Sequence, residues 1–326
     1  MNIYDIARLA GVSIATVSRV INGKGYVNKN TREKVLKVIT RHNYTPKKSA
    51  QNLSTGASLK LIGIVCYNIE DPYYAKAVAV LQRDLNRFGY DIILSCTGES
   101  RKQRQSCIDM LISKNVDAIV FIGSVFAGKS EQVILNAARH LPVFIINAKV
   151  EGKNIHCAYC DESDTVYECA RALFERGRRK LAFFYDVETY GSSKKREGFL
   201  RAVKDLGISE KYVMKCPPDL EGACREFEQF WEEGKADGAM CSNDELAAGI
   251  LKAARKMGIS VPGQLSVIGY NNSLIARCTS PALSSLENNV EKLAEFTAKN
   301  ISDYFSENQA VLDFKADFKL IIRETL

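Results

Sequence analysis

The sequence predicts an all-α segment at the N-terminus, joined to a larger α/β body in which parallel sheets are flanked by helices. Residues 1–46 show only helical periodicity. From residue 60 onward, short apolar runs alternate with helical patterns, which is typical of parallel strands and their crossover helices. A polar stretch, 47–58, separates the two regions. At 326 residues, the chain is long enough for more than one domain and a large core.

Two short helices around a tight turn are predicted at the N-terminus. Ile6, Leu9 and Ala10 lie three and four residues apart and therefore share one helix face. Gly11 can adopt the left-handed backbone that ends a helix, and Ser13 can cap the next helix. The second helix has an apolar stripe, Val17, Val20 and Ile21, and an outward face, Ile14, Ala15, Ser18, Arg19 and Asn22. This pattern is the helix-turn-helix, whose second helix enters the DNA major groove.

The distribution of charge points to nucleic acid as a partner. Residues 1–58 contain ten Lys or Arg and two acidic residues, Asp5 and Glu33, which gives a net charge of +8. The whole chain carries +7, so the remainder is nearly neutral. A basic module on a neutral body is the electrostatic footprint of nucleic-acid binding. This placement of charge argues against the alternative, a helix pair with a purely structural role.

A third helix is predicted over residues 31–42. Thr31 is its expected cap, and Val35, Val38 and Ile39 form its buried stripe. The segment before Pro46 ends the helix, because a residue that precedes proline disfavours the helical backbone. Residues 47–58 contain one Leu among polar residues and read as a linker.

The body is predicted to alternate strands and helices. Strands are expected at 61–66, 91–96, 118–122, 143–146, 181–185, 212–215, 238–241, 265–270 and, as a closing strand, 315–323. Helices are expected at 75–88, 101–114, 131–139, 166–176, 194–205, 224–233, 245–257 and 291–305. These are too many strands for one compact sheet, so two α/β lobes are expected. Ligands of such sheets bind at the carboxyl ends of the strands, which here is the cleft between lobes.

Neither catalysis nor metal binding is indicated. The chain has three His, no nucleophile-elbow motif and no phosphate-cradling glycine loop. Cys157 and Cys160 have the spacing of a metal or redox pair, but no second pair accompanies them, and the segment reads as a buried strand. No apolar run is long enough to span a bilayer, and no signal-peptide pattern is present. We therefore expect a cytoplasmic protein that is not an enzyme and needs no cofactor.

Several motifs follow one another in the order known from one protein family. They are Tyr4-Asp-Ile-Ala7, Ala10-Gly-Val-Ser13, Thr16-Val-Ser-Arg-Val20, Ala50-Gln-Asn-Leu53, Ser242-Asn-Asp-Glu245, Ser266-Val-Ile-Gly-Tyr270 and Leu320-Ile-Ile-Arg323. Over essentially its whole length the chain resembles the LacI/GalR family of bacterial transcriptional repressors. The resemblance implies a DNA-binding headpiece (1–46), a hinge helix (47–58) and a periplasmic-binding-protein-like body (59–326). It implies a lobe 1 of about 59–158 with 288–315, and a lobe 2 of about 159–287 with 316–326.

The resemblance also implies roles in DNA binding. Ile14 and Ala15 occupy the positions that most distinguish operators, where apolar side chains can touch thymine methyl groups. Arg19 is the candidate for a guanine contact. Leu53 would insert into the minor groove, although a chance apolar residue in a linker is the alternative. Further contacts that fix the register are implied for Ser13, Thr16, Ser18, Asn22, Tyr26, Asn28, Thr31, Tyr44, Lys47 and Gln51. For Tyr26 and Tyr44, a packing role is the equal alternative.

An effector pocket between the lobes is implied as well. Its candidates are Asp71, Tyr73, Tyr74, Asn147 and Asp161 on one side, and Lys195, Asn243, Asp244 and Asn271 on the other. Many relatives have Asp at positions 147 and 271, and Arg at position 195. An amide offers one acceptor and one donor group, and Lys lacks the planar fork of Arg. A sugar or sugar derivative is the expected effector; a different ligand, or a protein co-regulator as in the catabolite-control branch, is the alternative.

Together these features predict a dimeric DNA-binding regulator. Two headpieces must straddle two half-sites, so the operator should be near-palindromic. No Leu-heptad tail follows Arg323, so we expect a dimer rather than a tetramer. Two other classes fit the sequence less well, a periplasmic-type binding protein and an enzyme with a fused helical domain. The first has no use for a basic headpiece, and the second needs a catalytic cluster that the sequence lacks.

Overall fold

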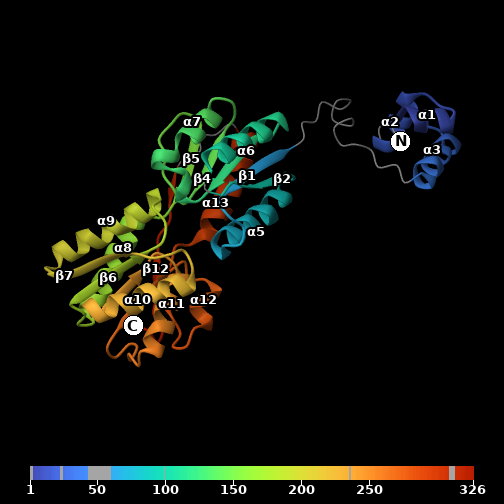
Figure 1. The fold of residues 1–326 in the computed structure, drawn as a ribbon. Coiled ribbons are helices and arrows are strands. Elements are labelled where there is room, and N and C mark those ends of the chain that lie inside the picture. Colours follow the sequence, from blue (N-terminus) through green and yellow to red (C-terminus); the bar gives the residue numbers. More distant parts are fainter. Residues whose placement is uncertain (1–2, 23–24, 43–59, 99, 235, 308–312) are drawn as a thin grey trace. The chain divides into compact units, whose positions relative to one another are not determined.

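The computed structural model describes residues 3–22, 25–42, 60–98, 100–234, 236–307 and 313–326, whose fold is drawn in Figure 1. The chain divides into two units, Met1–Lys60 and Leu61–Leu326. The predicted linker at 47–58 lies outside the described residues. Within the described ranges, no helix is long and apolar enough to cross a membrane.

The N-terminal unit contains three helices, α1 (Ile3–Ala10), α2 (Ile14–Asn22) and α3 (Lys29–Arg41). The predicted turn between α1 and α2 is confirmed. Gly11 has a φ of +63°, and the Thr16 amide donates to Ser13 Oγ over 3.1 Å. The three helices enclose a small core of Ile6, Ala7, Ala10, Val17, Val20 and Val35. The predicted helix-turn-helix is therefore present, with its apolar stripes facing inward.

Two details of this unit differ from the prediction. Leu9 is 46% exposed, and Ala7 is buried instead, because the inward face of α1 centres on positions 6, 7 and 10. Helix α3 begins at Lys29, and its cap is Asn28 rather than Thr31. The side-chain oxygen of Asn28 accepts from the Thr31 amide over 2.8 Å, so the residue predicted as the cap is the one that is capped.

Lobe 1 of the body is a parallel six-stranded sheet in the order β11-β5-β4-β3-β1-β2. Its strands are β1 (Leu61–Cys66), β2 (Asp91–Cys96), β3 (Ala118–Ile122), β4 (Val143–Ile146), β5 (Ile155–Tyr159) and β11 (Phe314–Lys315). Helices α5 (Pro72–Arg87) and α13 (Val290–Glu307) cover one face, and α6 (Arg101–Ser113) and α7 (Gln132–Ala138) cover the other. Side chains alternate between the faces, so Val120 packs with α5 and α13 while Phe121 packs with α6 and α7.

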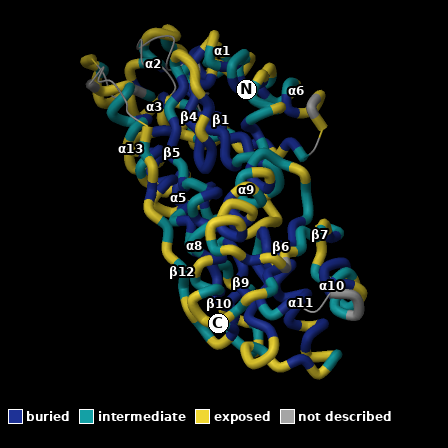
Figure 2. Tube along the Cα trace, turned by 90° about the vertical axis from the view of Figure 1, so that its left-hand side faces the viewer, coloured by how far each residue is buried: buried dark blue, intermediate teal, exposed yellow. Residues whose placement is uncertain are grey.

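Lobe 2 repeats this architecture in the order β12-β10-β9-β8-β6-β7, with only β12 antiparallel to its neighbour. Its strands are β6 (Lys180–Tyr185), β7 (Glu210–Lys215), β8 (Gly238–Cys241), β9 (Ser266–Tyr270), β10 (Ser284–Glu287) and β12 (Lys319–Ile321). Helices α8 (Glu162–Glu175) and α9 (Tyr190–Asp205) pack on one face. Helices α10 (Leu220–Gly234) and α11 (Asp244–Lys256) pack on the other. Figure 2 shows that buried residues follow the strands of both sheets while the outer helices carry the exposed ones.

Three connections pass between the lobes, at residues 160–161, 288–289 and 316–318. The second and third connections are joined by a hydrogen bond, which Asn289 Nδ2 donates to the Asp317 carbonyl over 2.7 Å. The single closing strand predicted over 315–323 is therefore wrong. Lys315 ends β11 in the first sheet and Lys319 begins β12 in the second, because the chain crosses between the lobes at this point.

The predicted strands 61–66, 91–96, 118–122, 143–146 and 238–241 match the observed bounds. Helices α5, α8 and α9 begin three or four residues earlier than predicted, directly after the N-caps Asp71, Asp161 and Thr189. Helix α12 (Leu274–Cys278) and strand β10 were not predicted. In β10, two fully buried serines interrupt the apolar pattern on which the prediction depends.

Candidate DNA-reading surface and effector cavity

The outward face of α2 is accessible to a partner. Ile14 is 41% exposed, Ser13, Ala15 and Arg19 are exposed beside it, and Thr16 and Ser18 are half-buried. Asn22 ends the same helix. The residues predicted to read DNA thus lie together on one helix, whose opposite side is held in the core by Val17 and Val20. Such a helix can enter a major groove without rearrangement of its own unit.

The other predicted DNA contacts differ in their surroundings. Tyr26 is 91% exposed before α3, and Thr31 is half-buried on α3. Asn28 uses its side-chain oxygen to cap α3, which leaves its Nδ2 group to donate to a phosphate. The remaining predicted contacts lie outside the described residues; they are Tyr44, Lys47, Gln51 and Leu53.

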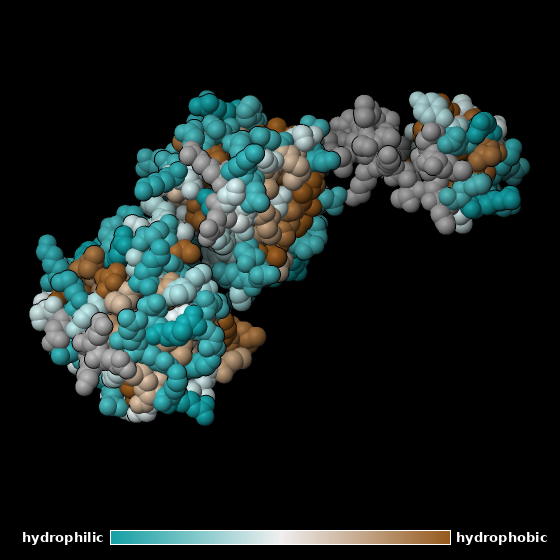
Figure 3. Space-filling view, in the orientation of Figure 1, coloured by the Kyte–Doolittle hydropathy of each residue, from teal (hydrophilic) through white to brown (hydrophobic). Residues whose placement is uncertain are grey.

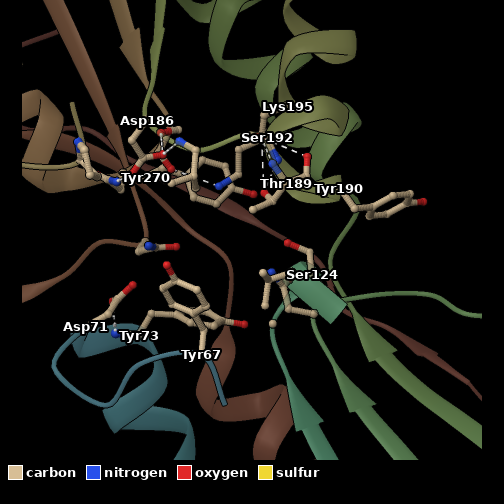
Figure 4. Close-up of a pocket in the computed structure, with 18 of the residues that line it drawn as sticks. Tyr67, Asp71, Tyr73, Ser124, Asp186, Thr189, Tyr190, Ser192, Lys195 and Tyr270 are labelled. Carbon is tan, nitrogen blue, oxygen red and sulfur yellow. Dashed lines mark hydrogen bonds between the residues drawn. The ribbon is translucent and has the colours of Figure 1, made fainter. Parts of the chain in front are cut away.

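A cavity of about 1590 Å³ lies between the two lobes of the body. It is lined by segments that follow β1, β3 and β4 in lobe 1 and β6, β8 and β9 in lobe 2, together with the first turns of α9. These are carboxyl ends of parallel strands, where ligands of such sheets bind. Of the nine predicted effector residues, eight line this cavity: Asp71, Tyr73, Tyr74, Asn147, Lys195, Asn243, Asp244 and Asn271. Figure 4 shows lining side chains facing one another from the two lobes.

Tyrosines form much of the wall on the lobe 1 side. The rings of Tyr73 and Tyr74 meet edge to face with centroids 5.3 Å apart, and the Tyr67 ring lies 6.4 Å from that of Tyr74. Asp71 caps α5 by accepting a hydrogen bond from the Tyr73 amide over 2.8 Å, and so fixes the start of the helix that carries Tyr73 and Tyr74. Burial raises the pKa of both the Tyr73 and Tyr74 phenols, so each stays a neutral hydroxyl at physiological pH.

Glu162 is a buried carboxylate that bridges the lobes. Asn147 Nδ2, from lobe 1, donates to its Oε1 over 3.3 Å, and Lys195 Nζ, from lobe 2, lies 3.7 Å from the same oxygen. Burial raises the pKa of Glu162, and the charge of Lys195 opposes that shift. The Lys195 ammonium also donates to the Ser242 carbonyl over 3.0 Å and sits 3.7 Å from the centroid of the Tyr270 ring. Lys195 is therefore fully engaged by the protein itself.

Asn243 and Asp244 build the lobe 2 wall through bonds within the protein. Asn243 caps α11, and its Nδ2 donates to Asp186 over 2.9 Å. Asp244 is 2% exposed, and its two oxygens accept from Ser285 Oγ over 2.5 Å and from the Ser273 amide over 2.6 Å. Burial raises the pKa of Asp244, and these hydrogen bonds oppose the shift. Asp186, which accepts from Asn243, also lines the cavity.

The backbone accounts for a short amide side chain at positions 147 and 271. Asn147 has a φ of +63° and Asn271 a φ of +94°, a left-handed region that Asn tolerates better than most residues. Asn271 Oδ1 accepts from Asn288 Nδ2 over 3.0 Å. Asn147 Oδ1, by contrast, is buried and has no hydrogen-bond partner among the described residues. Most buried acceptors in folded proteins have a partner, so this oxygen is an exception within the cavity wall.

Asp161 is the one predicted effector residue that does not line the cavity. Its carboxylate caps α8 by accepting the Ser163 and Asp164 amides, and Lys315 Nζ lies 3.2 Å from its Oδ2. The next residue, Glu162, lines the cavity instead. Several other residues line the cavity without having been predicted: Tyr67, Ser124, Asp186, Tyr190 and Tyr270. Asp186 could have been found, because it follows a buried strand directly, at the kind of strand end where ligands bind.

A helix-turn-helix unit with an exposed reading face and a two-lobed body with a cavity at its strand ends define a class of protein. The class is that of transcriptional regulators that combine a DNA-binding headpiece with a periplasmic-binding-protein-like body. Family models agree with this assignment. The model "Bacterial regulatory proteins, lacI family" matches residues 2–47, and the model "Periplasmic binding protein-like domain" matches residues 170–326.

Individual relatives resemble the chain over nearly its whole length. An HTH-type transcriptional regulator of Lachnoclostridium phytofermentans is 36% identical over 331 residues, covering 100% of this chain and 99% of that protein. The HTH-type transcriptional repressor PurR of Erwinia tasmaniensis is 30% identical, covering 92% of this chain and 88% of that one. These relatives are named as regulators and not as enzymes. The chain belongs to the lacI family of bacterial regulatory proteins and is a DNA-binding transcriptional regulator.

The fold is also shared with solved structures. The lac repressor dimer bound to operator and the anti-inducer ONPF superimposes with a TM-score of 0.86 at 21% identity, covering 100% of this chain and 98% of that one.

Proposed function

We propose that this regulator is a sequence-specific repressor whose affinity for a near-palindromic operator changes when a small molecule binds between its lobes. The observation that carries the proposal is the presence in one chain of an exposed α2 face and a large cavity lined by both polar and apolar groups. The proposed site of action is operator DNA in the bacterial cytoplasm. The proposed organisation keeps the headpiece (1–46), hinge (47–58) and two-lobed body (59–326) inferred from the sequence.

On the DNA side, the proposal assigns direct base contacts to the side chains that are exposed and not needed for the fold. Arg19 can donate two hydrogen bonds to guanine, and Ile14 and Ala15 can pack against thymine methyl groups. The hydroxyl and amide groups around them suit phosphate oxygens, which fix the position of the helix in the groove. The excess positive charge of residues 1–58 supplies the affinity that does not depend on sequence.

On the effector side, the proposal is a sugar or sugar derivative. Hydroxyl groups need donors and acceptors at close range, and Asn147 Oδ1 and Tyr73 Oη are buried polar atoms without partners in the described part of the chain. Tyrosine rings supply the flat apolar surfaces on which sugar C–H groups can pack. A protein co-regulator is the competing explanation. A protein co-regulator would leave Asn147 Oδ1 and Tyr73 Oη without hydrogen-bond partners.

Coupling between the two sites is proposed to act through the angle between the lobes. Where α9 meets lobe 1, the approach is so close that a Cβ atom at Gly191 would clash with Ser124 Oγ and Glu162 Oε2. A ligand that contacts both walls changes how closely the lobes approach. For this to alter operator binding, the ligand must bind the DNA-competent and DNA-incompetent forms with different affinity.

A homodimer is proposed, and apolar surface supports it. Figure 3 shows hydrophobic side chains gathered over the region of α5 and β2 in lobe 1 and over α12 in lobe 2. Among the exposed large hydrophobic residues are Phe88, Leu94 and Leu274, at 40%, 37% and 62% exposure. Patches of this kind on a regulator are expected to be covered by a second copy. Sedimentation at micromolar concentration should give a dimer mass, and a tetramer would contradict the assignment.

The decisive experiment selects duplexes from a random pool with the intact chain and measures binding by fluorescence anisotropy. The selected sequences should be palindromic, and binding should weaken by about 10³-fold or more between 50 and 200 mM salt. Residues 59–326 alone should bind none of these duplexes. Binding without sequence preference, or binding that survives removal of the headpiece, would overturn the proposal.

A further inference from the structure

Two carboxylates face the cavity from opposite lobes, and neither has an ion-pair partner in the described part of the chain. Asp71 follows β1 in lobe 1 and Asp186 follows β6 in lobe 2, and Figure 4 shows them on opposite sides of the cavity. Across the described ranges, neither forms an ion pair. Asp71 accepts the Tyr73 amide, and Asp186 accepts from Ser242 Oγ over 3.3 Å and from Asn243 Nδ2 over 2.9 Å.

The positively charged side chains that line the cavity are engaged elsewhere or lie exposed. Lys195 is held by Glu162, Ser242 and Tyr270, as described above. Arg104 donates to Ser130 Oγ over 3.0 Å and to the Val125 carbonyl over 3.3 Å. Arg196 pairs with Glu188, whose Oε1 lies 3.5 Å from its Nη1. Lys129 and Lys215 are exposed to solvent. No cation of the described chain therefore forms an ion pair with Asp71 or Asp186. Burial raises the pKa of Asp71, and the charge of Lys195 opposes that shift only in part.

Two further groups indicate that a ligand completes this region. Tyr73 is 8% and Asn147 6% exposed, both line the cavity, and Tyr73 Oη and Asn147 Oδ1 lack partners within the described ranges. They add one hydroxyl, which can donate or accept, and one amide acceptor beside the two carboxylates. The complementary molecule has a positive charge together with several hydroxyl groups.

We propose that the effector is a polyhydroxylated amine, such as an amino sugar, whose ammonium group lies between Asp71 and Asp186. This inference rests on the proposed function and names the ligand class for its cavity. When the lobes close, the two carboxylates approach each other and lose water, which opposes closure. An ammonium group between them reverses the sign of that interaction. The same charge pair thus couples ligand binding to lobe closure.

The test is a thermal-shift and calorimetric comparison of the intact chain with glucosamine, galactosamine and mannosamine against glucose, galactose, mannose and the three N-acetylated sugars. At least one amine should bind, and its neutral and acetylated counterparts should bind 10-fold or more weakly. Asp71→Asn and Asp186→Asn should each weaken the amine by 10-fold or more, because Asn removes the charge. At position 71, Asn keeps an oxygen to accept the Tyr73 amide, and at position 186 it keeps one of the two accepting oxygens. Glu70→Gln, at an exposed carboxylate of the same cavity, is the control and should change affinity less than 2-fold.

The outcomes separate this inference from the function on which it rests. Equal or tighter binding of a neutral sugar, or no binding by any amine, overturns the amine assignment. If a neutral sugar still changes operator affinity, the proposed function stands without it. If no small molecule changes operator affinity, while an amine binds and depends on Asp186, the ligand class is right and the proposed coupling is wrong.

A second inference concerns two thiols beside this cavity. Cys66 and Cys96 end the neighbouring parallel strands β1 and β2 in register, and their Sγ atoms lie 3.6 Å apart. Neighbouring strands are about 4.8 Å apart, which is within the Cα separation that a disulfide spans. Cys66 is buried and Cys96 is exposed. The residue after Cys66 is Tyr67, which lines the cavity.

The geometry points to an oxidation site at which peroxide converts Cys66 and Cys96 into a disulfide. The exposed Cys96 thiolate attacks one peroxide oxygen, the O–O bond breaks, hydroxide leaves, and a sulfenic acid forms. Cys66 Sγ then attacks the Cys96 sulfur, the S–O bond breaks, and water leaves with the Cys66 proton. In sum, two thiols and one hydrogen peroxide give one disulfide and two waters. Burial raises the pKa of the Cys66 thiol to about 12, so it reacts second.

The test treats the intact chain with hydrogen peroxide, blocks remaining thiols and maps disulfide-linked peptides by mass spectrometry. A Cys66–Cys96 cross-link should form, disappear in Cys96→Ser and persist in Cys278→Ser, which removes an exposed thiol from lobe 2. Reduction should restore the original mass. Oxidation of Cys96 to sulfinic acid without a cross-link, or a cross-link from Cys96 to Cys107 instead, would overturn the assignment.

Discussion

The N-terminal unit and the body present their functional groups in opposite ways. On α2, Ile14, Ala15 and Arg19 are exposed, while separate residues of the same helix hold the fold. In the cavity, Lys195 is bonded to its neighbours as well as facing the ligand space. The reading surface can therefore change without loss of the fold, whereas a change in the cavity acts on stability and binding together. The two units should respond differently to the same kind of substitution.

The largest effect is expected from a charge in the core of the N-terminal unit. Val35 is fully buried, so Val35→Asp places an unpaired carboxylate among the five other buried apolar side chains of this core. Burial of an unpaired carboxylate costs several kcal/mol, which exceeds the stabilisation that so small an apolar core provides. Operator affinity should fall by more than about 100-fold, measured by anisotropy, while the thermal unfolding of the body stays unchanged.

The matched control is the next residue. Leu36 is 45% exposed, so Leu36→Asp should leave the unit folded and retain operator binding to within a few-fold. If Val35→Asp also lowered the melting temperature of the body, the two units would not unfold independently, and the comparison between them would fail.

The next effect is expected in the cavity. Lys195→Met leaves Glu162 buried without its cation, which should lower the free energy of unfolding by about 3–5 kcal/mol at neutral pH. Because the pKa of Glu162 is already raised in the folded protein, protonation restores stability as the pH falls. The loss should therefore be largest near pH 8 and shrink toward pH 5, as measured by urea unfolding.

Lys252→Met is the control for this prediction. Lys252 forms an exposed ion pair with Glu221, and such pairs contribute less than about 1 kcal/mol. An equal loss of stability in the two variants, or a loss at Lys195 that does not depend on pH, would show that Glu162 does not carry the charge that Lys195 balances.

These contrasts also explain how far the sequence could predict the structure. Five strands matched to the residue. Four of them are buried parallel strands, which appear in the sequence as continuous apolar runs between turns, and the fifth, β2, is an edge strand with an apolar centre. Strand β10 was missed because buried serines there bond to partners that are distant in sequence, such as Asp244. Within the site, the separate roles of Asp161 and Glu162 could not be predicted from the sequence either. Both follow β5, and only the packing of α8 decides which carboxylate caps the helix and which enters the cavity.

A smaller and more local effect is expected on the reading face. Arg19→Ala should cost about 1–3 kcal/mol at one base position of the operator, because a bidentate contact to guanine discriminates by that amount. The measurement compares affinities for duplexes substituted at each position in turn. The body's unfolding should not change. A uniform loss across all duplexes, with a shallower salt dependence, would assign Arg19 to a phosphate instead.

The smallest effect is expected at the cap of α3, where two roles of Asn28 can be separated. Asn28→Ala removes the acceptor for the Thr31 amide and should cost about 1 kcal/mol in the stability of the N-terminal unit, whereas Thr31→Ala should cost only a few tenths. Asn28→Asp keeps the acceptor and places a negative charge at a helix N-terminus, which favours the fold. The same charge repels phosphate, so this variant should unfold like the parent protein and bind operator more weakly. If Asn28→Asp binds operator as the parent does, Asn28 is a cap alone, and the contact to DNA predicted for it is wrong.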